Sequence, residues 1–294
     1  MVVAQFLLTF REGLEAALLV GIIAAYLAKV GRKDLYRYVF LGSIAAIIVS
    51  VAIGLGIAAW ASELADWQLE AFEGIAALSA VAVLTYMIFW MASNSRKLKG
   101  KLEEKLDLQL SKGQVLGVAL LSFVAVVREG IETVLFLSTF VSEAVATAVG
   151  VVAGAAVVLV LTYLMFRGVY SLNLRRFFTY TSLLLIIFAA GLIAIGVHDL
   201  NEVYGDIHVG IPAVIDHVWN INGLLDSNGP VGSILAALLG YDGSPSLTQA
   251  IAYIGYWVVA GTYALWTFGP GRARESLARV GRAIRRHPRA PTDG

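Results

Sequence analysis

Two five-residue clusters with the same pattern of charges are the residues of this chain best suited to chemistry. The sequence reads R-E-G-L-E at residues 11–15, the first motif, and R-E-G-I-E at residues 128–132, the second motif. Both motifs lie inside long apolar runs. Ionisable side chains are costly at such places in a membrane protein and usually mark a functional site. Two copies of the same cluster argue further against a chance occurrence.

The spacing inside each motif places its two glutamates on one face of a helix, three residues apart, with an arginine four residues before the second glutamate. The resulting donor set is made of carboxylate oxygens without Cys, Met or His, and such a set suits hard cations. The sequence therefore predicts a metal site with two supporting arginines. Its ligands are Glu12, Glu15, Glu129 and Glu132, and its supporting residues are Arg11 and Arg128.

Charge does not select the metal, and other roles for the motifs stay open. Four carboxylates and two guanidinium groups leave two net negative charges, which a divalent ion neutralises and a trivalent ion exceeds. Each motif could instead be an ion-pair staple that locks helices together inside the membrane. A di-iron enzyme is disfavoured because carboxylate di-iron bundles use Glu-x-x-His pairs, whereas both motifs here are Glu-x-x-Glu.

The composition indicates a polytopic membrane protein. Of the 294 residues, 59% are hydrophobic and 15% are charged, against about 45–50% and about 25% in a soluble domain. The chain has no Cys, which excludes disulfides and thiolate metal sites, and its net charge of +1 gives no reason to expect a nucleic-acid partner. We expect a multi-pass protein of the cell membrane.

Apolar runs of about 20 residues, the length that crosses a bilayer, occur seven times. We therefore predict an all-α membrane protein with seven transmembrane helices. The predicted spans are Val2–Ala28, Val39–Ala61, Ala71–Met91, Val115–Thr139, Ala144–Phe166, Phe177–Val197 and Ala250–Phe268.

The basic residues predict the orientation of these spans. Twenty of the 22 Lys and Arg residues follow odd-numbered spans, and the other two are Arg11 and Arg128. Basic loops stay in the cytoplasm, so the N-terminus is expected outside and the C-terminus in the cytoplasm. The opposite face has many acidic residues and no Lys or Arg, which favours a local excess of cations.

The two motifs also predict an internal repeat. They are 117 residues apart and lie in spans one and four, which cross the membrane in opposite directions. Spans one to three and four to six then form a 3+3 inverted repeat, with one further span. In transporters built this way, ion sites lie near the midplane between the repeats. The predicted parts are a transporter domain at 1–270, with repeat one at 1–95, repeat two at 113–200, an outer segment at 201–247 and the seventh span at 248–269, and a basic cytoplasmic tail at 271–294.

Two pairs of acidic residues predict an outer access site that feeds the central one. Glu70 and Glu73 begin the third span, and Asp199 and Glu202 end the sixth, each pair with helical spacing. Ordinary solvation of helix ends is the alternative. Between spans three and four, residues 96–112 carry a leucine at every fourth position. This pattern fits a short amphipathic helix on the membrane surface or a solvated charged loop.

The paired motifs in a seven-span chain resemble the oxidase-dependent ferric iron permeases, the iron/lead transporter family. The stretch from Gly240 to Trp257 is also similar to the approach to that family's last span. The resemblance implies that the four motif glutamates carry iron and that the two arginines are essential neighbours. It also implies an extracytoplasmic oxidase or iron-delivery protein as partner.

The sequence thus predicts a permease, not an enzyme, that imports iron in the ferric state. Iron is expected as the transported substrate, and no permanently bound cofactor is expected. A transporter or exchanger of manganese, calcium or lead, and a membrane module that binds or senses metal without moving it, stay open as alternatives.

Overall fold

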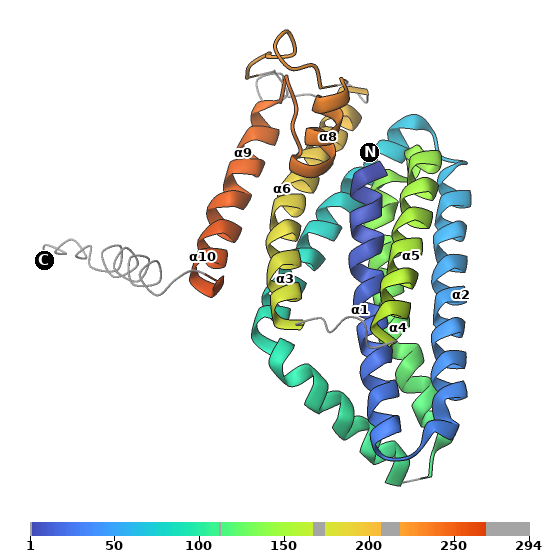
Figure 1. Ribbon diagram of the computed structural model, residues 1–294. Helices are drawn as coiled ribbons and strands as arrows, with labels where there is room; N and C mark the ends of the chain where they lie inside the picture. The colour runs from blue at the N-terminus through green and yellow to red at the C-terminus, as the bar shows by residue number, and fades with distance from the viewer. Residues whose placement is uncertain (1, 112, 167–173, 207–217, 228, 269–294) are drawn as a thin grey trace, which may run out of the picture.

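The computed structural model is all-helical in the part of the chain that it describes, residues 2–111, 113–166, 174–206, 218–227 and 229–268 (Figure 1). These ranges contain helices, turns and loops but no β-strand. The expected tail at 271–294, and residues 207–217 of the outer segment, lie outside the described residues.

Each of the seven apolar runs is helical where the structure describes it. The seventh is interrupted by one π-helical turn, and short 3-10 turns precede α2 and α5. The helices are α1 (Val2–Lys29), η1 (Lys33–Leu35), α2 (Tyr36–Ala61), α3 (Asp66–Ser111), α4 (Val115–Leu137), η2 (Ser138–Glu143), α5 (Ala144–Phe166), α6 (Leu174–Asp206), α8 (Pro230–Leu239), α9 (Leu247–Tyr256), η3 (Trp257–Gly261) and α10 (Thr262–Phe268).

Four stretches of the described chain are long and apolar enough to cross a membrane: Lys33–Ala61, Asp66–Met91, Val115–Met165 and Tyr180–Val203. The third stretch contains both α4 and α5, which run in opposite directions in Figure 1. Helix α1 is missing from this set although it has 28 residues, because the three charged residues of the first motif lie near its middle.

The long helices pack in a regular set of pairs. Helix α1 packs against α5, α2 against α4, and α3 against α6, while α1 and α4 also contact each other. Successive helices alternate in direction, so α1 and α4 are antiparallel (Figure 1). Glycines permit the close approach: a Cβ at Gly154 of α5 would lie 2.9 Å from the carbonyl oxygen of Phe6, and one at Gly42 of α2 would lie 2.2 Å from that of Ala119.

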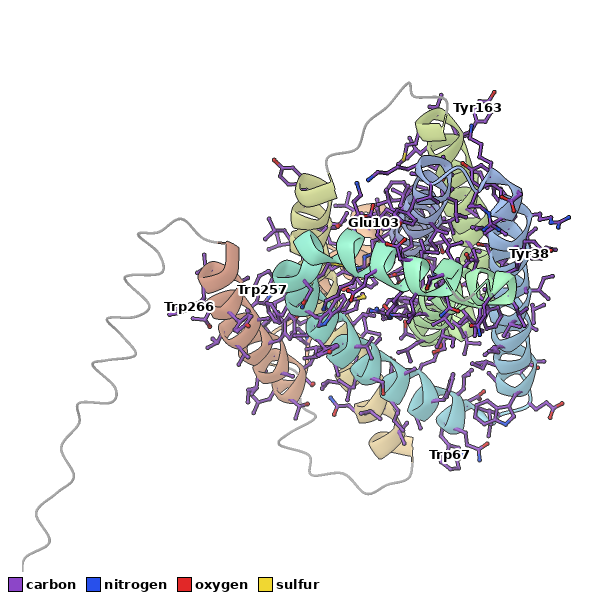
Figure 2. All side chains as sticks on the ribbon, turned by 90° about the horizontal axis from the view of Figure 1, so that it is seen from below. Tyr38, Trp67, Glu103, Tyr163, Trp257 and Trp266 are labelled. Carbon is purple, nitrogen blue, oxygen red and sulfur yellow. The ribbon has the colours of Figure 1, made fainter. Side chains whose placement is uncertain are left out.

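Helix α3 is longer than the predicted third span, and its C-terminal part is not a loop. The 46-residue helix runs through the leucine-rich stretch, which crosses the end of the bundle near Glu103 in the view from below (Figure 2). Leu106 is fully buried in a cluster with Leu27 of α1 and Val118 of α4, and the Tyr26 hydroxyl donates to Asp107. The alternative of a solvated loop is wrong, because Leu102, Leu106 and Leu110 pack against the ends of other helices.

The seventh predicted span is fixed to α6 by a polar network at its N-terminal end. Ser246 begins α9 with a capping box shared with Gln249. The amide of Asn201 on α6 donates to Ser246 Oγ and to Thr248 Oγ1, both at 2.9 Å. Below this network the helix packs along α6, and Tyr256 is bound to the Thr85 hydroxyl of α3 at 3.2 Å.

Candidate metal site

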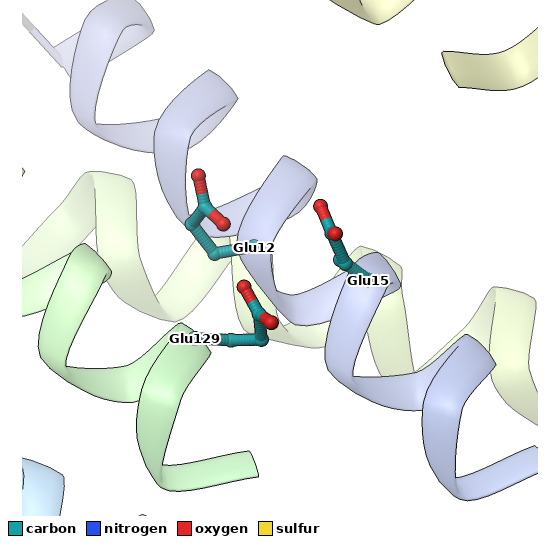
Figure 3. A group of neighbouring side chains, drawn as sticks. All are labelled: Glu12, Glu15 and Glu129. Atoms are coloured by element: carbon teal, nitrogen blue, oxygen red, sulfur yellow. The ribbon is translucent and has the colours of Figure 1, made fainter. Parts of the chain in front are cut away.

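Three of the four motif glutamates meet inside the bundle. One carboxylate oxygen each from Glu12, Glu15 and Glu129 lies within 4.8 Å of the others, and Figure 3 shows the three carboxylates turned toward one another. The residues are 1%, 2% and 2% exposed. Such a group of buried oxygens has the size and the chemistry of a metal site. We call it the carboxylate cluster.

The cluster forms because two antiparallel helices present their motifs to each other. Glu12 and Glu15 lie one turn apart on α1, and Glu129 reaches them from α4. The motif glycines lie against other helices: a Cβ at Gly13 would be 3.0 Å from Val158 of α5, and one at Gly130 would be 2.0 Å from Ser50 Oγ of α2. The glycines thus let α5 and α2 pack close beside the carboxylates.

Arg11 is enclosed together with the cluster. It is 5% exposed, forms an ion pair with Glu12 through Nη1, and reaches Glu15 Oε2 through Nη2 at 3.0 Å. The pair with Glu15 follows from the spacing of four residues, whereas the pair with Glu12 was not predicted. Nη1 also lies 3.5 Å from the sulfur of Met87 on α3. One guanidinium therefore neutralises part of the charge of two carboxylates.

Arg128 occupies a more open position. Its side chain is 47% exposed, and Nε lies 2.9 Å from Glu132 Oε1 but 4.0 Å from Glu129 Oε1. The guanidinium carbon is 5.5 Å from the centre of the Trp90 ring of α3, a cation–π distance. Glu132 is not one of the three clustered carboxylates; it pairs with Arg128 beside the cluster.

Several oxygens of the site have no hydrogen-bond donor in the part of the chain that the structure describes. They are Oε2 of Glu12, Glu15, Glu129 and Glu132, although the Glu15 atom is within ion-pair distance of Arg11. Buried carboxylate oxygens without donors are unusual and call for an explanation. A bound cation would give these oxygens a partner and so explain why they lack donors.

The electrostatics of the cluster favour a cation. Two carboxylates 4.8 Å apart repel each other by about 3 kcal/mol at an effective dielectric constant near 20. Three carboxylates beside one arginine leave two net negative charges if all four groups ionise, and Arg11 lies within ion-pair distance of only two of the three. A divalent cation between the oxygens would attract each carboxylate and so offset these repulsions. The same arrangement would be a poor staple, because a staple needs balanced charge.

The four acidic residues of the predicted outer access site also come together. Helices α3 and α6 touch where a Cβ at Gly74 would lie 3.0 Å from the Gly196 oxygen. Near this contact, Asp199 interacts electrostatically with the other three, Glu70, Glu73 and Glu202. Glu73 Oε1 accepts 2.8 Å hydrogen bonds from the backbone N–H and hydroxyl of Ser142.

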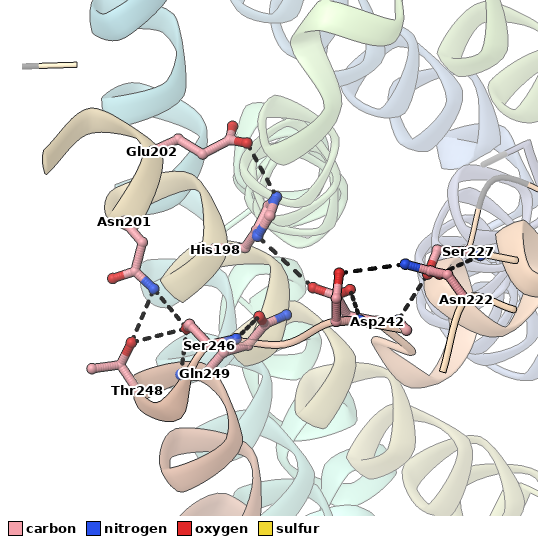
Figure 4. A network of polar contacts seen from close by, with 11 residues as sticks. His198, Asn201, Glu202, Asn222, Ser227, Asp242, Ser246, Thr248 and Gln249 are labelled. Carbon is pink, nitrogen blue, oxygen red and sulfur yellow. Dashed lines mark hydrogen bonds and ion pairs between the residues drawn. The ribbon is translucent and has the colours of Figure 1, made fainter. Parts of the chain in front are cut away.

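His198 links the end of α6 to the outer segment beside these carboxylates. Its Nε2 lies 3.4 Å from Glu202 Oε1, and its Nδ1 lies 3.9 Å from Asp242 Oδ2 (Figure 4). The Glu202 carboxylate thus interacts both with Asp199 and with His198. Sequence reasoning missed this contact, as it missed Met87 and Trp90 beside the arginines. The His198–Glu202 pair has helical spacing, but no pattern in the chain links His198 to Asp242 or the arginines to Met87 and Trp90.

A bundle of apolar helices that encloses ionisable residues is typical of membrane proteins that act on ions. The family model described as "Iron permease FTR1 family" matches residues 2–266, nearly the whole chain. This protein therefore belongs to the iron permease FTR1 family. Its members are permeases, so the predictions of an iron transport protein of the membrane and of a non-enzyme are confirmed.

Curated relatives agree with the family. An uncharacterized protein of Archaeoglobus fulgidus is 41% identical over 258 residues, which cover 86% of this chain and 90% of that protein. Proteins named ferrous iron permease EfeU, from Yersinia pestis and Escherichia coli O6:H1, are each 34% identical and cover 87% of this chain and 90% and 92% of their own lengths. No solved structure matches the chain.

Proposed function

We propose that this protein imports iron through a central site formed by the motif glutamates of α1 and α4. The observation that carries the proposal is the meeting of three buried carboxylates, with unbonded oxygens, from two antiparallel helices. Glu12, Glu15 and Glu129 bind the ion directly. Glu132 completes the ligand set when the ion is present, and Arg11 and Arg128 balance the carboxylates when it is absent.

The proposed architecture has seven spans and a 3+3 inverted repeat. A two-fold axis that exchanges α1 with α4, α2 with α5 and α3 with α6 would relate the α1–α5 pair to the α2–α4 pair, and both pairs occur. The same exchange leaves α1–α4 and α3–α6 as self-paired contacts, which also occur. With the basic loops in the cytoplasm, the N-terminus is outside and iron moves toward the C-terminal side of the cell membrane.

The oxidation state of the iron is open to test. The family resemblance implied ferric iron delivered by an extracytoplasmic oxidase or iron-delivery protein. One observation favours ferrous iron: the EfeU relatives are named ferrous iron permeases. Uptake measured with ferrous iron under ascorbate, and with ferric citrate, separates the two states.

A flux measurement tests the proposal as a whole. Purified protein is reconstituted in vesicles, and entry of radioactive iron is followed for the wild type and for Glu12→Ala and Glu129→Ala. We expect saturable uptake by the wild type and its loss in both variants, with normal reconstitution of each. Wild-type flux in either variant would contradict the site, and metal binding without flux would favour a binding or sensing module.

The choice among metals is tested by competition. Manganese, calcium and lead are each added in excess to the same vesicles while iron entry is measured. The iron assignment predicts weak competition by manganese and calcium. Replacement of iron as the best substrate by one of them would support an exchanger or permease for that cation.

We further propose that the acidic group at the outer ends of α3 and α6 accepts iron before it reaches the cluster. Asp199 is the most informative member because it interacts with the other three carboxylates, whereas Glu73 also binds Ser142. Asp199→Asn should raise the half-saturating iron concentration and leave the maximal rate unchanged. Asp66→Asn, at the start of the same α3, is the matched control. An unchanged half-saturating concentration in Asp199→Asn would exclude this access role.

A further inference from the structure

The N-terminal part of α1 carries a polar stripe that the carboxylate cluster does not use. Thr9 lies four residues after Gln5 and three residues before Glu12, so the three share one helix face. Gln5 is 0% exposed and Thr9 is 9% exposed, although both are polar and lie in an apolar segment. The stripe runs from the expected outer end of α1 down to Glu12.

These two side chains leave buried oxygens without a donor. The Gln5 amide nitrogen lies 3.5 Å from Oε2 of Glu143, the last residue of η2, and 3.4 Å from Oγ1 of Thr147, in the first turn of α5. Gln5 Oε1 and Thr9 Oγ1 have no hydrogen-bond partner among the residues that the structure describes. An unmatched buried polar atom costs free energy, so a stripe of them on one face calls for a ligand.

Two glycines of α5 lie against the polar stripe of α1. A Cβ at Gly150 would lie 2.7 Å from Gln5 Cβ, and one at Gly154 would lie 3.0 Å from Thr9 Cβ. With no side chain at these two positions, the α5 backbone forms the opposite wall. The stripe is thus confined between α1 and α5, and Glu143 lies at its outer end.

The second repeat provides a comparison within the molecule. The residues 117 positions after Gln5 and Thr9 are Ser122 and Val126. Ser122 is also fully buried, but its hydroxyl donates to the Val118 carbonyl at 3.2 Å, and Val126 has no polar atom. Packing between helices therefore does not require unmatched oxygens at these positions. The unmatched oxygens thus occur in the first repeat and not at the equivalent positions of the second.

We propose that Gln5 and Thr9 form the outer leg of the iron path, a neutral oxygen site between Glu143 and the carboxylate cluster. This inference rests on the proposed function. Amide and hydroxyl oxygens are hard donors that can replace the water ligands of a small cation. Because they carry no charge, they hold the ion weakly enough to pass it on. Glu143 attracts the ion, and Glu12 receives it.

The test uses variants that change the oxygens and preserve the shape. Thr9→Val removes the hydroxyl, Thr9→Ser keeps it, and Gln5→Leu removes the amide. Entry of ferrous iron into reconstituted vesicles is measured together with equilibrium iron binding to the purified protein. We expect kcat/KM to fall roughly tenfold in Thr9→Val and in Gln5→Leu, the size of a lost polar contact, and to stay within about twofold of wild type in Thr9→Ser. Iron binding at the cluster should persist in all three.

The matched control is Ser122→Ala, the equivalent position of the second repeat, which should transport as the wild type does. Wild-type kinetics in the double variant Gln5→Leu/Thr9→Val would overturn the outer leg alone. Equal losses in Thr9→Ser and Thr9→Val would also overturn it, because they would point to packing. Absence of iron entry in the wild-type protein would instead overturn the proposed function.

Discussion

The two motifs have the same pattern of charges but very different surroundings. In the first motif Arg11 is 5% exposed and pairs with both glutamates of its own helix. In the second motif the Arg128 side chain is 47% exposed and lies over Trp90, and only Glu129 joins the carboxylate cluster. The same charge pattern thus gives an enclosed arginine on α1 and a half-exposed arginine on α4.

This difference indicates that the two motifs have different roles in binding the ion. A buried arginine with two carboxylates is held in one geometry, because every alternative leaves a charge unpaired in a low dielectric. A half-exposed arginine on one carboxylate can move at low cost. We therefore expect the first motif to fix the site and the second motif to adjust when the ion enters or leaves. The predictions below test that contrast, beginning with the largest expected effect.

Glu129→Gln should have the largest effect, and Glu132→Gln a much smaller one. Loss of a clustered carboxylate should weaken iron binding by about 100-fold or more, the scale of removing one partner of a buried charge pair. Equilibrium iron binding to the purified protein measures this. Without iron, Glu129→Gln should melt at a higher temperature than the wild type, because the repulsions of Glu129 with Glu12 and Glu15 are gone. A lower melting temperature would favour the staple role instead.

Replacing the arginines should affect stability unequally. Arg11→Met leaves Glu12 and Glu15 without their counter-charge and should destabilise the iron-free protein by about 3–5 kcal/mol. Arg128→Met breaks a partly exposed pair and should cost about 1 kcal/mol or less. Thermal unfolding in detergent compares the two variants. Equal losses would show that the two motifs are energetically alike.

The motif glycines should also respond unequally to alanine. A Cβ at residue 130 would lie 2.6 Å from Ser50 Cβ, whereas one at residue 13 would lie 3.0 Å from the end of the Val158 side chain. Gly130→Ala should cost about 1–3 kcal/mol through overpacking, and Gly13→Ala less. Ser50→Gly should restore the stability of Gly130→Ala in the same unfolding assay. Failure of this rescue would place the strain elsewhere.

Trp90 should contribute the smallest effect. Its ring lies 5.5 Å from the Arg128 guanidinium, and such contacts contribute about 0.5–1 kcal/mol. Trp90→Leu should therefore change the kcat/KM of iron uptake by about two- to fivefold, and Trp90→Phe by less. Met87→Leu, at the first motif, is the control and should leave uptake unchanged. A change larger than tenfold in Trp90→Leu would mean that the ring does more than hold Arg128.

Much of the fold could be predicted from the sequence because the bilayer simplifies the problem. Apolar runs of the right length are helical in the structure, and α1 begins at Val2 and α2 ends at Ala61 as expected. Seven spans, the repeat and the orientation stay predictions supported by helix directions and pairs. The leucine-rich end of α3 was ambiguous because its pattern fits any apolar surface, and only the contacts of Leu106 identify the bundle as its partner.

The sequence by itself determined which residues could bind a cation and which of them share a helix face, because helical spacing is local. Only the tertiary structure decided that Glu129 joins Glu12 and Glu15 while Glu132 stays with Arg128. It also decided that Arg11 is buried and Arg128 is not. The physical reason is that burial and the distance between residues on different helices depend on how the helices pack. Two motifs with the same charge pattern hold no information about their different neighbours.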